Sequence, residues 1–174
     1  MAMHTIHDLF EHELKDMYSG EHTLLDALEQ MAGESTDREI KKAHTQHRKE
    51  TQAQIRRLEK IFKAIGRKPQ VESCSGIEGL LKEKKTFARE RPTDELVEFF
   101  NVGAGQKIER YEISSYENLI DMADKLGLTE AVDLLEQNLQ EEEAALNKLK
   151  VFASEFDVTE EMEEEQAGPR SRRR

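Results

Sequence analysis

The sequence predicts an all-α protein, a bundle of four long helices with one long crossover. Apolar residues recur at the helical period over four long segments, and no segment shows strand-like alternation. Short connections join these segments in two pairs, whereas about 26 residues separate the pairs, which is typical of a bundle with a crossover. Only three prolines and nine glycines occur in 174 residues, so little interrupts long helices.

The first helix pair is expected at 5–31 and from a cap at 35–37 to about residue 65. Gly33 ends the first helix, and Gly66 and Pro69 end the second. The inner face of the first helix is Ile6, Phe10, Leu14, Met17, Tyr18, Glu21, Leu24, Leu25 and Leu28. The inner face of the second is Ile40, Ala43, His47, Glu50, Gln54, Leu58 and Ile61.

The second pair follows a connection at 66–92 that contains a short helical piece at 77–87. Thr93 and Asp94 cap the third long helix, which ends near Gly127, and Thr129 begins the fourth, which runs to about residue 156. A helix of about 30 residues is roughly 45 Å long, and a connection of this length spans it. We expect one domain at 1–157. Residues 158–174 are acidic, then basic, and are expected to form a disordered charged tail.

The composition excludes several classes of function. The net charge of −11 argues against a nucleic-acid partner, because phosphate binding needs a basic face. The single cysteine, Cys74, excludes an intramolecular disulfide and fits a reducing compartment. No apolar run is long enough to span a membrane, and the N-terminus lacks an apolar signal core. We therefore expect a cytoplasmic protein.

Two acidic residues interrupt the apolar face of the third long helix. Glu109 and Glu112 lie three residues apart, so both project from the face that carries Val102, Tyr116 and Leu119. Burial of unpaired carboxylates is costly. These two must therefore be protonated, ion-paired or bound to metal.

Counting from the two helix turns places further polar residues at the same height. Glu21 and His47 lie equally far in sequence from the connection between the first two helices, and Glu50 lies within about 5 Å of their height. Glu112 and Glu142 lie equally far from the connection between the last two helices. Each helix then offers an inward acid at mid-bundle. Four or five carboxylates balance two divalent ions, and such a set favours iron or manganese. The predicted metal ligands are Glu21, His47, Glu50, Glu109, Glu112 and Glu142. Glu50 and Glu142 are the candidates for bridging both ions.

Simpler interpretations remain open for individual residues. An inward glutamate can lie at the edge of an apolar face, and the three tyrosines are expected in the core with bonded hydroxyls. Cys74 is expected to be structural, and the choice between Glu141 and Glu142 stays open. The remaining histidines show no ligand spacing and are expected at the surface or at an edge: His4, His7, His12, His22 and His44.

Several segments resemble the YciE/YciF family of ferritin-like bacterial stress proteins, over roughly residues 3–155. They are TIHDLF at 5–10, DMYSGE at 16–21, HRKET at 47–51, CSGIEGL at 74–80, ERYEISSY at 109–116, and LL at 134–135 followed by EEE at 141–143. The resemblance implies a ferritin-like bundle, commonly a dimer, with a di-metal carboxylate site and a link to osmotic or oxidative stress.

The chain departs from the general ferritin-like pattern at two positions. Ala53 and Ala145 stand where a histidine would follow Glu50 and Glu142 by three residues.

The first hypothesis is a di-iron or di-manganese protein that oxidises Fe(II) or consumes peroxide or oxygen. The second is a non-enzymatic stress-induced bundle that binds a partner or shields macromolecules, which the missing histidines favour. A cage for iron storage is a third, weaker hypothesis.

Overall fold

The structure is a computed structural model and describes residues 3–156. Its helices are α1 (Ile6–Glu34), α2 (Arg38–Ala64), α3 (Ser75–Phe87), the 3-10 turn η1 (Ala88–Glu90), α4 (Asp94–Lys125) and α5 (Thr129–Glu155). No strand occurs in this part of the chain. The predicted all-α bundle with a short fifth helix in the crossover is confirmed. The predicted tail at 158–174 lies outside the described residues.

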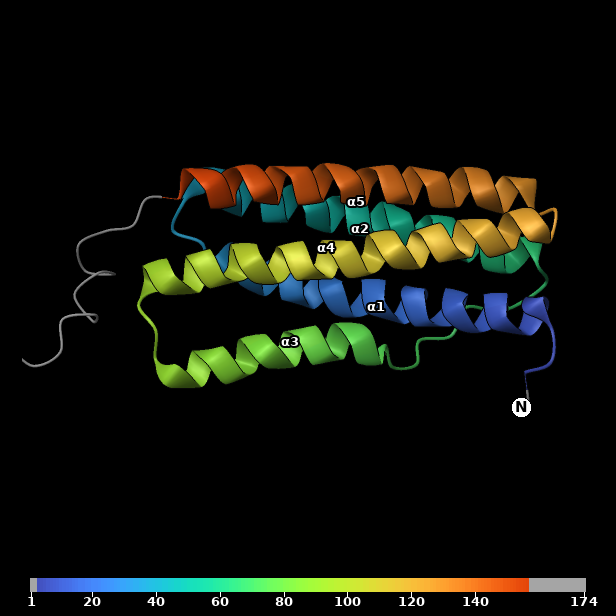
Figure 1. Cartoon of the computed structure of the whole chain (residues 1–174), viewed down its shortest axis with the longest axis horizontal. Helices are drawn as coiled ribbons and strands as arrows, with labels where there is room; N and C mark the ends of the chain where they lie inside the picture. Colours follow the sequence, from blue (N-terminus) through green and yellow to red (C-terminus); the bar gives the residue numbers. More distant parts are fainter. Residues whose placement is uncertain (1–2, 157–174) are drawn as a thin grey trace, which may run out of the picture.

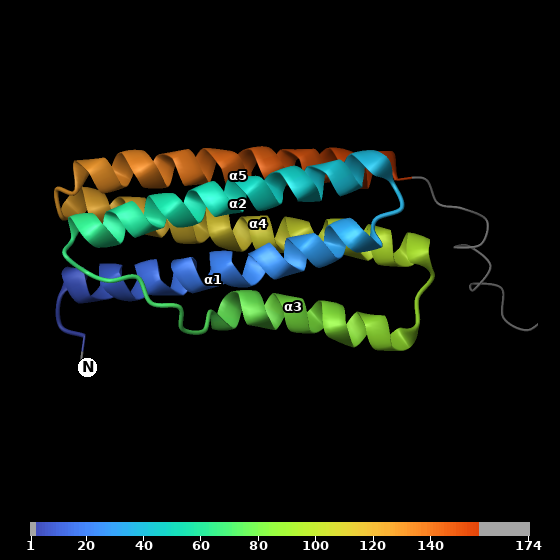
Figure 2. The same ribbon diagram turned by 180° about the vertical axis from the view of Figure 1, so that it is seen from behind.

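The four long helices pack side by side in the cyclic order α1, α2, α5, α4 (Figure 1). Neighbours in this order run antiparallel, and the α1–α2 and α4–α5 turns lie at opposite ends of the bundle (Figures 1 and 2). The crossover returns the chain along the whole bundle, and α3 packs outside it against α1 and α4. This topology brings the middles of all four long helices to one level.

Local signals in the sequence explain where the helices begin and end. Thr5 forms a capping box with Asp8 at the start of α1. The Asp37 side chain accepts hydrogen bonds from the first free backbone N–H groups of α2. Gly66 and Gly127 follow α2 and α4 with φ of 71° and 69°, a conformation that costs glycine little. Glu98 of α4 anchors the α1–α2 turn, because its carboxylate accepts hydrogen bonds from the backbone N–H groups of Thr36 and Asp37.

The apolar core is divided by the polar middle of the bundle. One large cluster fills the end near the α4–α5 turn and includes Phe10, Leu58, Phe62, Leu119 and Leu135. A smaller cluster of Ile40, Val102 and Leu149 fills the other end. A third cluster, of Leu24, Met31, Cys74, Ile77 and Ile108, packs α3 against α1 and α4. Apolar burial contributes about 25 cal/mol per Å2, so these clusters stabilise the bundle around its polar middle. Ile6, expected on the inner face, is 39% exposed because it lies in the first turn of α1, beyond the packed core.

Close backbone approach fixes α3 against the bundle. A Cβ atom at Gly76 would lie 2.4 Å from the Tyr111 ring, so only glycine fits there. Cys74 precedes α3, is fully buried, and its Sγ lies 3.1 Å from Asp16 Oδ2. The Tyr111 hydroxyl donates to the same carboxylate at 3.0 Å. Burial raises the pKa of the Cys74 thiol, which agrees with the structural role expected for it.

Within residues 3–156, every helix is too polar or too short to cross a lipid bilayer.

Candidate metal centre

The six predicted ligands come from all four long helices and meet near mid-bundle. Glu21 belongs to α1, His47 and Glu50 to α2, Glu109 and Glu112 to α4, and Glu142 to α5. Four of them form a tight group, hereafter the carboxylate cluster: His47, Glu109, Glu112 and Glu142. One ligand atom from each lies within 4.8 Å of the others. Glu21 is fully buried beside this cluster, whereas Glu50 is only partly buried at its edge.

His47 is the central cation of the carboxylate cluster. Its Nε2 lies 3.3 Å from Glu109 Oε1 and 3.4 Å from Glu142 Oε2, and its Nδ1 lies 3.4 Å from Glu50 Oε2. Burial acts to lower the pKa of His47, but the charges of Glu109 and Glu142 outweigh it and raise the pKa well above 6.5. For Glu109, burial acts to raise the pKa, and the charge of His47 brings it below its usual value. His47 and Glu109 therefore form an ion pair at neutral pH.

The other buried acids of this region have raised pKa values. Burial raises the pKa of Glu112 well above its usual value, and the charges of Glu21 and Glu109 add to the effect. Burial and the charge of Glu112 do the same for Glu142. Burial raises the pKa of Glu21 to about 8, although a hydrogen bond from Tyr116 opposes the shift. In the metal-free protein, burial therefore favours the protonated forms of these three acids.

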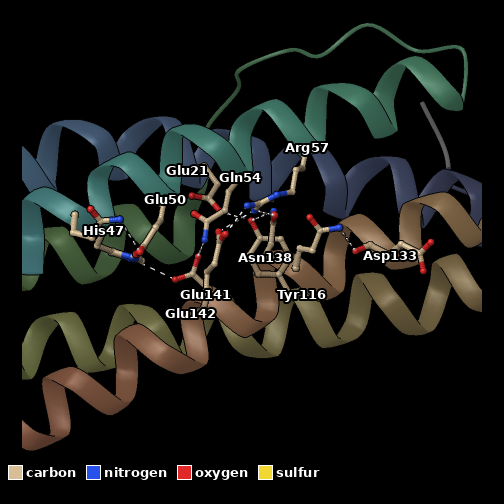
Figure 3. A network of polar contacts seen from close by, with 12 residues as sticks. Glu21, His47, Glu50, Gln54, Arg57, Tyr116, Asp133, Asn138, Glu141 and Glu142 are labelled. Carbon is tan, nitrogen blue, oxygen red and sulfur yellow. Dashed lines mark hydrogen bonds and ion pairs between the residues drawn. The ribbon is translucent and has the colours of Figure 1, made fainter.

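Side chains around the cluster orient two of the acids (Figure 3). The Tyr116 hydroxyl donates to Glu21 Oε1, and Asn138 Nδ2 donates to the Tyr116 oxygen at 2.9 Å. Gln54, fully buried one turn beyond Glu50, donates from Nε2 to Glu142 Oε1 at 2.5 Å. Such partners fix the direction in which a carboxylate presents its remaining oxygen.

The structure separates Glu141 from Glu142. Glu142 points into the bundle and is fully buried. Glu141 pairs with Arg57 on α2, whose Nη2 lies 2.5 Å from Glu141 Oε1 (Figure 3). Arg57 also donates from Nη1 to Asn138 Oδ1 at 2.5 Å. Glu141 is therefore neutralised at the edge of the bundle, and Glu142 is the acid available to the cluster.

Several carboxylate oxygens of this region are buried without a hydrogen-bond partner among the described residues. Both oxygens of Glu112 are in this state, as are Oε2 of Glu21, Glu109 and Glu142. An unpartnered buried polar atom costs about 1–3 kcal/mol, and native structures contain few of them. One oxygen each of Glu109, Glu112 and Glu142 lies within 4.8 Å of the others and of a His47 nitrogen, and such oxygen donors fit hard divalent cations. The chemistry of this cluster therefore fits the metal site that the sequence predicts.

The comparisons with known proteins agree with the resemblance. Residues 5–163 match the family model described as "Domain of unknown function (DUF892)". The chain belongs to the DUF892 family. Protein YciF of Escherichia coli (strain K12) is 35% identical to this chain over 154 residues, which are 88% of this chain and 93% of YciF.

Solved structures resemble the DUF892 chain over most of its length. The crystal structure of the E. coli stress protein YciF matches with a TM-score of 0.82 and 34% identity, covering 87% of this chain and 96% of that one. YcfI of Rhodopseudomonas palustris, described as a candidate structural protein, matches with a TM-score of 0.81 and 39% identity, covering 84% and 94%. A protein of Xanthomonas campestris pv. campestris, 21% identical, shares the fold with a TM-score of 0.73 and covers 94% and 100%. The predicted ferritin-like family and fold are confirmed.

One prediction about the histidines is wrong. His44 was expected at the surface or at an edge, but its side chain is only 3% exposed. Its Nε2 has no hydrogen-bond partner among the described residues, and burial, with the charge of His47, lowers its pKa to about 4. The available signal was its position one helical turn before His47 and next to Ala43, which was expected on the inner face.

Proposed function

We propose that this DUF892 protein binds two divalent metal ions, iron or manganese, at mid-bundle and acts in a stress response. The observation that carries the proposal is a group of four fully buried carboxylates beside the buried imidazole of His47, with five carboxylate oxygens that have no hydrogen-bond partner within residues 3–156. Ionised together, Glu21, Glu109, Glu112 and Glu142 carry four negative charges, and His47 releases its proton when a ring nitrogen binds metal. Added divalent cations supply the missing charge.

The protein residues would divide the work of holding these ions. His47, Glu109, Glu112 and Glu142 would form the central ligands, with Glu21 and Glu50 on either side. Bound iron or manganese supplies Lewis-acid and redox chemistry. Gln54 and Tyr116 hold Glu142 and Glu21 in place, and the two apolar ends of the bundle limit access of water.

The reaction class that this site supports best is oxidation of Fe(II) or consumption of peroxide or oxygen. Carboxylate oxygens are hard ligands, and His47 is the only nitrogen donor in the group. The same observation favours a second candidate, a non-enzymatic bundle whose acids are neutralised by any divalent ion. The description of the R. palustris relative as a candidate structural protein agrees with that second role.

Metal stoichiometry tests the proposal. Purified protein is dialysed anaerobically against Fe(II) or Mn(II), and the metal per chain is measured by mass spectrometry. We expect two equivalents in the wild type, loss of metal in Glu142→Ala, and no change in the control Glu136→Gln, because Glu136 is exposed. Less than one equivalent in the wild type refutes the proposal. Peroxide and oxygen consumption by the loaded protein then separates the enzyme from the non-enzymatic bundle, and native mass tests the expected homodimer.

A further inference from the structure

The outward face of α4 carries apolar side chains that the four-helix bundle does not cover. Of the seven phenylalanines, only Phe10 and Phe62 are fully buried, and Phe99 is 46% exposed. Phe99 belongs to a set of residues along the amino-terminal half of α4, which runs between α3 and the carboxyl-terminal end of α5 (Figure 1). The set lines a hollow of about 310 Å3. Its members, hereafter the aromatic ridge, are Leu96, Phe99, Phe100, Gly103 and Ala104.

Neighbouring segments cover the aromatic ridge only at its two sides. Phe87 of α3 stacks on Phe100 with ring centroids 4.1 Å apart, and the Phe156 ring lies 4.8 Å from that of Phe99. The opposite face of α4 already packs in the core of the bundle. A bundle helix normally has a polar outward side, as α2 has at the exposed Lys49. The aromatic ridge is a second apolar face of α4, and exposed apolar surface of this kind is typical of an interaction site.

Gly103 is an independent sign that another backbone packs on this face. Glycine is a poor helix former, yet Gly103 lies exposed in the interior of α4. A Cβ atom at Gly103 would meet nothing within 4 Å in the described part of the chain. At Gly105, by contrast, a Cβ atom would lie 2.9 Å from Leu149 Cδ1, so packing inside the bundle explains that glycine. A glycine on an apolar helix face lets a second helix approach closely.

The aromatic ridge is complementary to itself. Two copies of α4 that pack antiparallel, with a two-fold axis between positions 101 and 102, place Phe99 of each copy opposite Ala104 of the other. The same axis places Phe100 opposite Gly103, so each large ring meets a small residue in both directions.

The charges at the two ends of the ridge fit the same arrangement. Leu96 falls opposite Lys107 of the other copy, and the apolar stem of a lysine covers such a side chain. The ammonium group of that Lys107 then lies near the acidic first turn of α4, which contains Asp94 and Glu95.

We propose that the aromatic ridge binds a second copy of this chain, with α4 packed antiparallel against α4 of the other copy across a two-fold axis. This assigns a surface to the expected homodimer. Aromatic anchors contribute much of the binding energy of protein interfaces, and Phe99 and Phe100 are the anchors here. The contact does not involve the carboxylate cluster, so the dimer and the metal site stand or fall separately.

Filling the position of Gly103 tests the surface without harming the fold. Gly103→Gln places a side chain in open space within one chain, and glutamine suits a helix better than glycine. Sedimentation of the full chain over a range of concentrations, in a chelating buffer, measures the dissociation constant of the dimer. Gly103→Gln should raise this constant at least about 30-fold, the effect of losing one interface anchor, at unchanged helical content. Gly79→Gln is the matched control and should change nothing, because Gly79 lies exposed on α3, also with nothing within 4 Å in the described range, and does not line the hollow.

Removing an aromatic anchor is the second arm of the same measurement. Phe99→Gln should also weaken the dimer about 30-fold. Val151→Gln is its control, because Val151 is 50% exposed on α5 and does not line the hollow. A wild type that is monomeric at about 100 μM would overturn the proposal, as would a dimer that Gly103→Gln and Phe99→Gln leave as stable as their controls do.

Cross-linking tests the antiparallel register. Leu96→Cys and Lys107→Cys are prepared separately and treated with a bismaleimide about 8 Å long, which matches the spacing of packed helices. Native Cys74 is fully buried and is not expected to react. The two copies of position 96 lie about 16 Å apart in the proposed register, too far for the linker, whereas positions 96 and 107 face each other. We expect cross-linked dimer in the mixture and none in either variant alone. Cross-links within one variant alone, or none in the mixture at concentrations where the wild type is dimeric, refute the register.

Discussion

Glu112 offers the sharpest test of the metal site. Its carboxylate is 1% exposed, and both of its oxygens lack a partner among the residues described. The change Glu112→Gln keeps the shape of the side chain and replaces the ionisable carboxyl group with an amide that cannot ionise. The new amide N–H groups can donate to the unpartnered oxygens of Glu21, Glu109 or Glu142. The substitution should therefore stabilise the metal-free protein and weaken its metal binding.

The magnitude follows from the cost of the unpartnered carboxylate. Relieving a buried unsatisfied group is worth about 1–3 kcal/mol. About 2 kcal/mol raises the melting temperature of a domain of this size by about 4–8 °C. Metal at 1,000 times its dissociation constant stabilises the wild type by about 4.1 kcal/mol, and a variant that binds no metal gains nothing. The order of the two melting temperatures should reverse when metal is added.

Differential scanning calorimetry with and without Mn(II) measures both effects. Glu136→Gln makes the same substitution at an exposed site on α5 and should follow the wild type in both conditions. A metal-free Glu112→Gln variant that melts no higher than the wild type would contradict the argument from unpartnered oxygens. Equal stabilisation of wild type and variant by Mn(II) would show that Glu112 does not bind the ion.

Three further predictions concern its neighbours. Burial raises the pKa of Glu21 to about 8 in the folded protein, against 4.5 for an ordinary glutamate, so the folded state binds more protons than the unfolded state between these pH values. Raising the pH from 5 to 7 should therefore lower the free energy of unfolding of the metal-free protein by about 3 kcal/mol, measured by urea denaturation. Bound metal should remove this loss. Gln54→Leu removes the hydrogen bond to Glu142 and should lower Mn(II) affinity about 10- to 100-fold in calorimetric titration, whereas unchanged affinity would refute the orienting role. His47→Leu leaves Glu109 without its cation and should lower the free energy of unfolding of the metal-free protein by about 3–5 kcal/mol in the same urea denaturation. Replacing a charged residue that has no ion-pair partner should not have this effect.

The helical period and the connection lengths were sufficient to predict the architecture. Short turns at 35–37 and 126–128 require antiparallel neighbours, and the long connection at 65–93 spans the bundle. The fixed rise of a helix also made the heights of the acids predictable. Counting from the turns brought Glu21, His47 and Glu142 to mid-bundle, where the structure has them buried.

Only the tertiary structure decided how these residues meet. Sequence spacing gives the height of a side chain along a helix, but packing against neighbours sets the rotation of the helix about its axis. That rotation buries His44, which was expected at the surface or an edge, and leaves Glu50 at the rim of the carboxylate cluster. It also pairs Gln54 with Glu142 from another helix, a contact between residues 88 positions apart. Such contacts depend on which faces of different helices pack together, and no local pattern in the sequence contains that information.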